Sequence, residues 1–145
     1  MTVRRIMNSN VVYLTPDDTV SHAAKLLEHH KIGMLPVCSS DGKLRGIVTD
    51  RDIAIRCVAF DNPPEDTKLR DIMTRGIVTI SPDDDVTEAA NTMATERIRR
   101  LPVVENNRVV GILSLADIAT RASFDAEFSS ALSEICMPEN KIKRF

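Results

Sequence analysis

The sequence predicts a mixed α/β (α+β) protein made of two tandem β-α-β-β-α repeats and a C-terminal helix. Three observations lead to this fold class. Several short motifs recur about 66 residues apart. Short β-rich runs alternate with segments whose apolar residues recur at helical spacing. Of the 145 residues, 43% are hydrophobic and 3% are aromatic. A chain of this length forms one domain or two small units, here with an aliphatic core.

The internal repeat covers most of the chain. Ile6-Met7 recurs as Ile72-Met73 and Leu35-Pro36-Val37 as Leu101-Pro102-Val103, each 66 residues later. Beyond a one-residue deletion in a turn the offset is 65, so that Asp52-Ile53 matches Asp117-Ile118. We therefore expect the first repeat at 1–60, a linker at 61–67 that contains Pro63-Pro64, the second repeat at 68–122 and a tail at 123–145.

Each repeat is predicted to begin with a strand and a helix. Residues 11–14 and 77–80 are β-rich runs that a Thr-Pro or Ser-Pro pair ends. Apolar residues then follow at positions i, i+3, i+4 and i+7, which predicts one buried helical stripe in each repeat. The two stripes consist of Val20, Ala23, Ala24 and Leu27, and of Val86, Ala89, Ala90 and Met93.

Two strands around a tight turn come next in each repeat. Residues 34–38 and 44–48 flank Asp41-Gly42, and residues 100–104 and 109–113 flank Asn106-Asn107, which are hairpin signals. A second helix is predicted to begin after Thr49 and after Ser114.

The tail carries a stripe of its own, with Phe124, Phe128, Leu132 and Ile135 at roughly helical spacing. This predicts an amphipathic helix. It would either pack against its own module or form a dimer contact.

Composition and motifs exclude several classes of function. A net charge of −2 and few aromatic residues argue against binding of nucleic acid. No apolar run is long enough for a membrane helix, the N-terminus does not resemble a signal peptide, and three widely spaced cysteines indicate reduced thiols in a cytoplasmic protein. No phosphate loop, nucleophile elbow or metal-ligand spacing is present, so the chain is predicted not to be an enzyme and to have no metal site.

The start of the second helix carries the same polar pattern in both repeats, a hydroxyl residue followed three positions later by a carboxylate. The pairs are Thr49 with Asp52 and Ser114 with Asp117. One interpretation is a simple helix cap. The other is a ribonucleotide site, in which the hydroxyl contacts a phosphate and the carboxylate accepts hydrogen bonds from a ribose diol.

The ordered set of motifs resembles a cystathionine-β-synthase (CBS) domain pair, or Bateman module. The resemblance covers about residues 3–121 and rests on x-Leu-Pro-Val before each hairpin and Gly-Ile-x-hydroxyl-x-x-Asp-Ile after its turn. The sequence of the first repeat at 32–38 and 49–53 resembles that of small stand-alone CBS pairs of the hypoxic response protein type. The family implies a pseudo-twofold module with two clefts between its repeats, which take AMP, ADP, ATP, NAD-type nucleotides or S-adenosylmethionine as regulatory ligands and require no cofactor.

Carried over by position, the resemblance makes Asp52 and Asp117 the ribose carboxylates and Thr49 and Ser114 the hydroxyls near the phosphate. It assigns further contacts to the main chain near the adenine, to two prolines beside it and to a basic pair before x-Pro-Val. These residues are Val12, Tyr13, Val78, Thr79, Pro36, Pro102, Arg99 and Arg100. The first repeat has Gly33-Met34 where the second has Arg99-Arg100, so the two sites are predicted to be unequal.

The expected function is a non-catalytic, energy-sensing regulatory module that binds an adenosine-containing ligand. The alternative is a structural or protein-interaction module that binds no nucleotide. A homodimer is expected in either case, and an effector protein of unknown identity would read the signal.

Overall fold

The computed structural model describes residues 1–122, and the predicted tail helix lies outside the described residues. The chain divides into two compact units. Within the described residues, unit 1 contains Met1–Ser9, Thr79–Val103 and residues 111–122, whereas unit 2 contains Asn10–Val78 and Val104–Val110. Unit 2 therefore holds most of the first repeat together with residues 61–78, and unit 1 holds most of the second repeat together with Met1–Ser9. Residues 61–78 and Met1–Ser9 are called the exchanged segments below. The repeat boundaries at 60, 67 and 122 stay a prediction, because the two structural units do not follow the order of the repeats along the chain.

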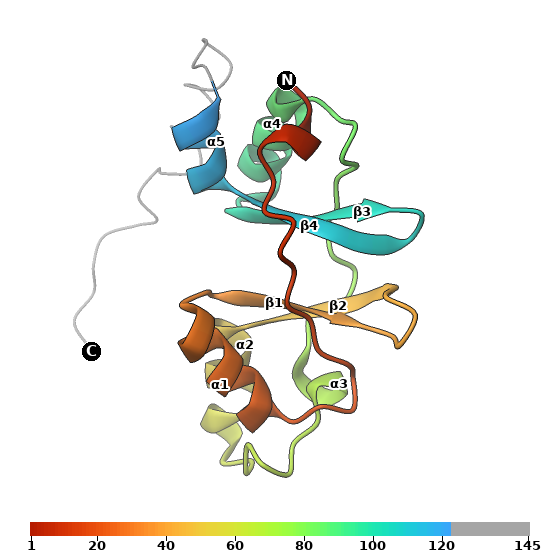
Figure 1. Cartoon of the computed structure of the whole chain (residues 1–145). Coiled ribbons are helices and arrows are strands. Elements are labelled where there is room, and N and C mark those ends of the chain that lie inside the picture. The colour runs from red at the N-terminus through yellow and green to blue at the C-terminus, as the bar shows by residue number, and fades with distance from the viewer. Residues whose placement is uncertain (123–145) are drawn as a thin grey trace, which may run out of the picture. The chain divides into compact units, whose positions relative to one another are not determined.

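Unit 2 is built around one antiparallel hairpin. Its elements are α1 (Val20–His30), β1 (Met34–Cys38), β2 (Leu44–Thr49), α2 (Asp50–Arg56), the 3-10 helix η2 (Val58–Phe60) and α3 (Leu69–Ile72). Leu35 pairs with Val48, and Pro36 with Ile47. The turn contains Gly42 at φ +84°, a backbone angle that glycine adopts without strain. The helices α1, α2 and α3 lie on one side of this hairpin (Figure 1).

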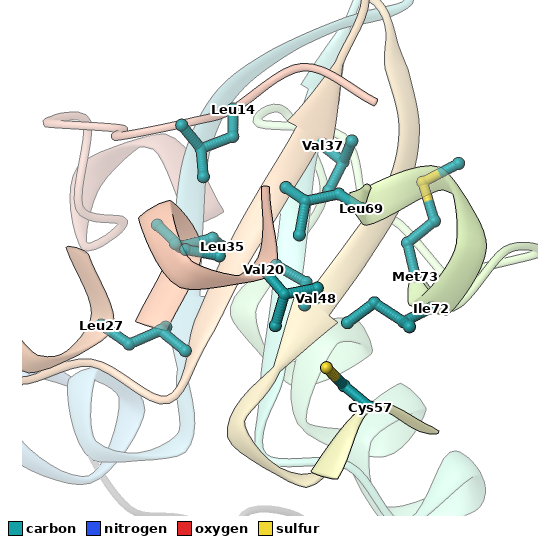
Figure 2. Close-up of a cluster of buried hydrophobic side chains, with 11 residues drawn as sticks. Leu14, Val20, Leu27, Leu35, Val37, Val48, Cys57, Leu69, Ile72 and Met73 are labelled. Carbon is teal, nitrogen blue, oxygen red and sulfur yellow. The ribbon is translucent and has the colours of Figure 1, made fainter. Parts of the chain in front are cut away.

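The core of unit 2 joins three parts of the chain. The strands supply Leu35, Val37 and Val48, all fully buried, and α1 supplies Val20 and Leu27. The segment after the linker adds Leu69, Ile72 and Met73 to the same cluster. In Figure 2 the side chains of Leu69 and Ile72 point towards those of Val37 and Val48 on the hairpin. Residues 69–73 therefore belong structurally with the first repeat.

Unit 1 repeats this plan. Its helices are the 3-10 helix η1 (Val3–Arg5), α4 (Val86–Glu96) and α5 (Leu115–Arg121). Its hairpin consists of β3 (Arg100–Glu105) and β4 (Arg108–Ser114), although Val104–Val110 at the tip of this hairpin belongs to unit 2. Asn106 and Asn107 both have positive φ angles, of 51° and 64°, as a two-residue hairpin turn of type I′ requires. The N-terminal segment lies beside α4 (Figure 1), where the Val3 N–H donates to the Asp84 carbonyl at 2.9 Å.

The predicted stripe on the first helix of each repeat is confirmed in α4 and wrong at one position in α1. Val86, Ala89, Ala90 and Met93 are all buried. Ala24, the equivalent of Ala90, is exposed, because Leu26 packs against the core of unit 2 instead. The position that corresponds to Leu26 in α4 is the polar Thr92, which leaves the buried position to Ala90.

The predicted strands at 11–14 and 77–80 are wrong as strands, because each contributes a single parallel bridge. Leu14 pairs with Val37, and Ile80 pairs with Val103. Extending the first ladder in either direction would need an N–H from Pro16 or Pro36, and extending the second would need one from Pro82 or Pro102. Proline has no backbone N–H, so each ladder ends after one residue.

Two repeat-equivalent glycines explain how the exchanged segments fit. A Cβ built on Gly46 would lie 2.8 Å from the Thr74 carbonyl oxygen, and one on Gly111 would lie 3.1 Å from the Asn8 carbonyl oxygen. Thr74 pairs with Ile47 and Asn8 pairs with Ile112. The glycine in each repeat thus lets the exchanged segment approach the edge of the hairpin closely. Thr74 and Asn8 of these segments pair with Ile47 and Ile112, which lie shortly before the starts of α2 and α5.

Candidate functional site

The β2–α2 junction forms a complete capping box. Thr49 is the N-cap of α2, and its Oγ1 accepts a hydrogen bond from the Asp52 N–H at 3.1 Å. Asp52 Oδ2 accepts one in return from the Thr49 N–H at 3.0 Å. This reciprocal pair satisfies two backbone donors at the start of a short helix. The capping interpretation is therefore correct for this pair, and it leaves the other oxygen of Asp52 to be explained.

The outer oxygen of Asp52 is engaged within unit 2. The Thr74 hydroxyl donates to Oδ1 at 3.0 Å, and Arg56 Nη1 lies 3.4 Å from the same oxygen. Asp52 is 5% exposed, and no other buried residue of the described chain is charged. A buried carboxylate needs such partners, because an unpaired one would lose its hydration without compensation.

The β4–α5 junction has the same capping box with a different outer environment. The Asp117 N–H donates to Ser114 Oγ at 3.0 Å, and Oδ2 of Asp117 accepts from the Ser114 N–H at 2.9 Å. The Ser114 hydroxyl also donates to Oδ2 at 2.8 Å. Within residues 1–122 every hydrogen bond to this carboxylate comes from Ser114 and ends on Oδ2. Asp117 is only partly buried, so its Oδ1 is open to solvent or a ligand.

The two junctions therefore use their polar groups differently. In the described chain the Thr49 hydroxyl only accepts, which leaves its proton available, while the carboxylate of Asp52 is engaged at both oxygens. Ser114 gives its proton to Asp117, which keeps one open oxygen. Both helices have seven residues. Such short helices have little dipole, so a ligand bound at either junction would depend mostly on side chains.

The backbone N–H groups at the two helix starts also differ. The first N–H of α2, from Asp50, donates to the Gly33 carbonyl at 3.3 Å, and the first of α5, from Leu115, donates to the Arg99 carbonyl at 2.8 Å. The next N–H of α2, from Arg51, is taken by the Asp50 carboxylate at 2.8 Å. In the second repeat Leu115 replaces Asp50, so no carboxylate occupies that position.

The main chain predicted to frame an adenine is unpaired in the described residues. No hydrogen bond there involves the backbone of Val12, Tyr13, Val78 or Thr79. For the carbonyls of Val12 and Val78 the cause is the missing N–H of Pro36 and Pro102, which would otherwise donate to them. Both prolines are buried. Their predicted place beside the adenine stays a prediction.

The basic pair of the second repeat is exposed. Arg100 is the first residue of β3 and Arg99 comes directly before it, and in the described chain neither side chain has a hydrogen bond or ion pair. The carbonyl of Arg99 is bonded to the first N–H of α5, which places this residue next to the Ser114–Asp117 junction in the same unit. Gly33 holds the equivalent position in the first repeat and carries no charge.

The cysteines and histidines of the described chain show no reactive arrangement. Cys38 and Cys57 are buried and unpaired, and burial raises the pKa of the Cys38 thiol to about 11. A thiol with so high a pKa is protonated and a poor nucleophile at neutral pH. His29 and His30 contact each other edge to face, and residues 1–122 contain no cluster of three or more metal-ligating side chains. None of the helices described there is long and apolar enough to cross a bilayer.

Sequence reasoning missed three residues that surround the junctions: Thr74, Arg56 and Arg121. Arg56 Nη1 donates to the Ile72 carbonyl at 2.9 Å, and Arg121 Nη1 donates to the Ile6 carbonyl at 3.4 Å. The two arginines occupy equivalent positions, 65 residues apart, so the repeat offset could have revealed them. Thr74 gave no such signal, because its equivalent is Asn8.

Comparison with known proteins identifies the fold. The family model of the CBS domain matches residues 3–58 and again residues 69–123. The chain belongs to the CBS-domain family. As a CBS pair it is 35% identical over 133 residues to the CBS domain-containing protein YhcV of Bacillus subtilis, which covers 92% of this chain and 94% of that protein. It is 36% identical to hypoxic response protein 1 of Mycobacterium tuberculosis over 81% of this chain and 82% of that one.

Solved CBS structures agree with this assignment. The crystal structure of hypoxic response protein I with two coordinated zinc ions has a TM-score of 0.78 at 33% identity and covers 85% of this chain and 100% of that one. The CBS pair of protein MJ0100, solved with 5′-methylthioadenosine and S-adenosyl-L-methionine, has a TM-score of 0.74 at 33% identity, covering 82% and 93%. The predicted family and the fold class of two tandem CBS repeats are confirmed.

Proposed function

We propose that this CBS pair is a non-catalytic regulatory module that binds an adenosine-containing ligand. The observation that carries the proposal is the open carboxylate oxygen of Asp117, which lies beside the Ser114 hydroxyl and in the same unit as Arg99 and Arg100. A carboxylate accepts hydrogen bonds from both hydroxyls of a ribose, and an arginine binds phosphate through a planar pair of donors. Together these groups suit a ribonucleotide.

The unpaired main chain at Val12, Tyr13, Val78 and Thr79 supports the same class of ligand. An adenine presents adjacent donors and acceptors along one edge, and a free stretch of backbone offers the complementary groups. The complex of the MJ0100 CBS pair with two adenosine compounds gives further support, because it belongs to a related chain of the same fold. The ligand proposed here is AMP, ADP, ATP, an NAD-type nucleotide or S-adenosylmethionine.

A thermal-shift panel with these five compounds tests the proposal. A ligand that binds only the folded chain should add about 2.7 kcal/mol of stability at a hundred times its dissociation constant. Adenine-free controls such as ribose 5-phosphate should give a smaller shift. An unchanged melting temperature with every adenosine compound would contradict the proposal.

The module is proposed to bind its ligand without converting it. The chain aligns with 23% of the inosine-5′-monophosphate dehydrogenase of Methanocaldococcus jannaschii, at 35% identity, so the likeness does not extend to most of that enzyme. Chromatography after a long incubation should recover the bound compound intact. Conversion at a rate above the protein-free control would indicate an enzyme. The buried, unpaired thiols Cys38 and Cys57 accord with the proposed cytoplasmic location.

An exposed apolar patch favours self-association and keeps an interaction module as the second candidate. Ile55, Val58 and Phe60, on α2 and η2 of unit 2, are 44%, 60% and 71% exposed. Large exposed apolar side chains that lie close together often form a surface that binds another protein. We expect a second copy of the chain to cover it as a homodimer. Light scattering should report about twice 16.1 kDa, and Phe60→Ser should shift the particle towards the monomer mass. A wild-type particle of monomer mass would contradict the dimer.

A further inference from the structure

The exposed apolar patch of unit 2 continues directly into an acidic loop at residues 61–66. Phe60, the last residue of the patch, is 71% exposed, and the loop that follows it carries three exposed carboxylates, on Asp61, Glu65 and Asp66. Residues 57–66 contain no lysine, arginine or histidine. A partner that covers this surface therefore needs apolar and positively charged side chains close together.

Main-chain hydrogen bonds hold the acidic loop in place at two points. The Asn62 N–H donates to the Cys57 carbonyl at 3.1 Å, which attaches the start of the loop to the end of α2. The Ser21 N–H donates to the Pro64 carbonyl at 3.0 Å, which attaches its second half to the start of α1. The carboxylates are thus presented by a fixed backbone next to the apolar patch.

The acidic loop is not neutralised by its own surroundings. Within residues 1–122 the side chains of its three carboxylates form no ion pair. The bases that flank the loop along the chain are used elsewhere, since Arg56 lies 3.4 Å from Asp52 and Lys68 lies 3.6 Å from Asp17. The negative charge of the loop is therefore available to a partner.

The chain itself contains a segment of complementary composition. Residues 141–145, outside the described residues, read Lys-Ile-Lys-Arg-Phe and are called the basic segment here. The 18 residues at 123–140 connect it to the described chain and can span up to about 60 Å. The acidic run at 83–85 of unit 1 suits this segment less well, because Asp83 already pairs with Arg4 at 3.2 Å.

On the basis of the homodimer proposed above, we infer that the basic segment of one copy binds the acidic loop and the apolar patch of the second copy. Its three bases face the three carboxylates, and Ile142 and Phe145 cover the exposed apolar side chains beside them. In a twofold dimer each copy gives one segment and receives one, so this contact is made twice. Single exposed ion pairs contribute little, but several charges that act together beside an apolar contact contribute more.

Charge reversal in the full-length chain tests the inference. The tail variant carries Lys141→Glu, Lys143→Glu and Arg144→Glu. The loop variant carries Asp61→Lys, Glu65→Lys and Asp66→Lys. In a light-scattering dilution series each variant alone should dimerise at least tenfold more weakly than the wild type, because attraction becomes repulsion. An equimolar mixture of the two should recover the dimer, since each segment again meets a loop of opposite charge on the other copy.

Two control chains separate this contact from general effects of charge and folding. A matched variant has the net charge of the tail variant but carries its reversals at exposed arginines elsewhere, as Arg45→Glu, Arg75→Glu and Arg97→Glu. It should dimerise within about threefold of the wild type. A chain that combines the tail and loop reversals has the net charge of the wild type and should dimerise as the wild type does. Raising the salt concentration should weaken the wild-type dimer, since exposed charges are screened.

Several outcomes would overturn the inference while leaving the proposed homodimer standing. A tail variant that dimerises as tightly as the wild type would show that the basic segment is not part of the interface. A mixture of the tail and loop variants that stays monomeric would show that the segment does not bind the second copy. A wild-type chain of monomer mass would instead overturn the homodimer, and this inference with it. Ligand binding is tested separately by the thermal-shift panel.

Discussion

The β2–α2 and β4–α5 junctions share a capping box but differ in the groups placed around it. At the first, the exchanged segment brings Thr74 against the carboxylate of Asp52, and Arg56 closes the network. At the second, Asp117 is bonded within its own capping box, and the basic residues Arg99 and Arg100 lie exposed at the start of β3. The comparison teaches that one repeated motif can serve packing in one copy and remain available for binding in the other. Seven substitutions, grouped into four effects, test this difference.

The largest expected effect is on the close approach of the exchanged segments. In Gly46→Ala the new Cβ would lie 2.8 Å from the rigid Thr74 carbonyl and 3.0 Å from Sδ of the buried Met73. We expect a loss of about 1–3 kcal/mol in the free energy of unfolding, the usual range for overpacking. Urea denaturation followed by circular dichroism measures it.

The matched variant Gly111→Ala should be milder. Its closest contact, at 2.6 Å, is Sδ of Met7, a flexible side chain that is only partly buried and can move aside. Replacing glycine also restricts the unfolded chain, which favours folding by about 0.4–1 kcal/mol. Equal losses in the two variants would show that the two segments are held equally tightly.

The second effect concerns the two aspartates as structural groups. Asp52→Asn removes the charge that Arg56 and Thr74 contact in a site that is 5% exposed. This should reduce stability by about 1–3 kcal/mol. Asp117→Asn keeps an acceptor for the Ser114 N–H and loses no ion pair, so its cost should stay below about 1 kcal/mol. Thermal unfolding of both variants without ligand provides the measurement, and a larger loss in Asp117→Asn would contradict the distinction.

The order of elements and the capping boxes could be predicted from the sequence, because helical period, turn residues and hydroxyl-x-x-carboxylate spacing are local signals. The position of the exchanged segments could not be predicted, because nothing in the sequence around Leu69, Ile72 and Met73 indicates which of the two cores these side chains join. The strands at 11–14 and 77–80 were predicted too long because the prolines that end each ladder include Pro36 and Pro102, which lie on the neighbouring strand. The engagement of Asp52 likewise depends on Thr74, a contact across 22 positions.

The third effect tests the basic pair. Arg100→Ala should weaken AMP more than adenosine, by about 1 kcal/mol, because an exposed guanidinium contributes the low end of a charge-assisted hydrogen bond. Added salt should shrink the difference, since exposed charges are screened. Stability should change by less than about 0.5 kcal/mol. Calorimetry with both compounds at two salt concentrations checks this. Equal weakening of AMP and adenosine would mean that Arg100 shapes the site and does not bind the phosphate.

The smallest effect separates the first helices of the two repeats. Asp85 caps α4 by accepting from the Thr87 N–H at 2.8 Å, whereas the equivalent residue Thr19 caps α1 by accepting from the His22 N–H at 3.1 Å. The hydrogen bonds from Thr87 hold the pKa of the Asp85 carboxyl below its ordinary value. A lowered folded-state pKa means that this stabilisation is fully present above the unfolded-state pKa, which is about 3.9 for aspartate, and is lost as the pH falls through the folded-state value.

Asp85→Thr should therefore flatten the fall in melting temperature below about pH 4 while keeping a cap on α4. The control Thr19→Asp should steepen the same fall, because it places a titratable cap on α1. Melting curves from pH 2.5 to 7 compare the three chains, and above pH 5 Asp85→Thr should differ little from the wild type, since threonine is a good N-cap. An acid limb that is identical in wild type and Asp85→Thr would show that the cap of α4 contributes nothing to the difference between the repeats.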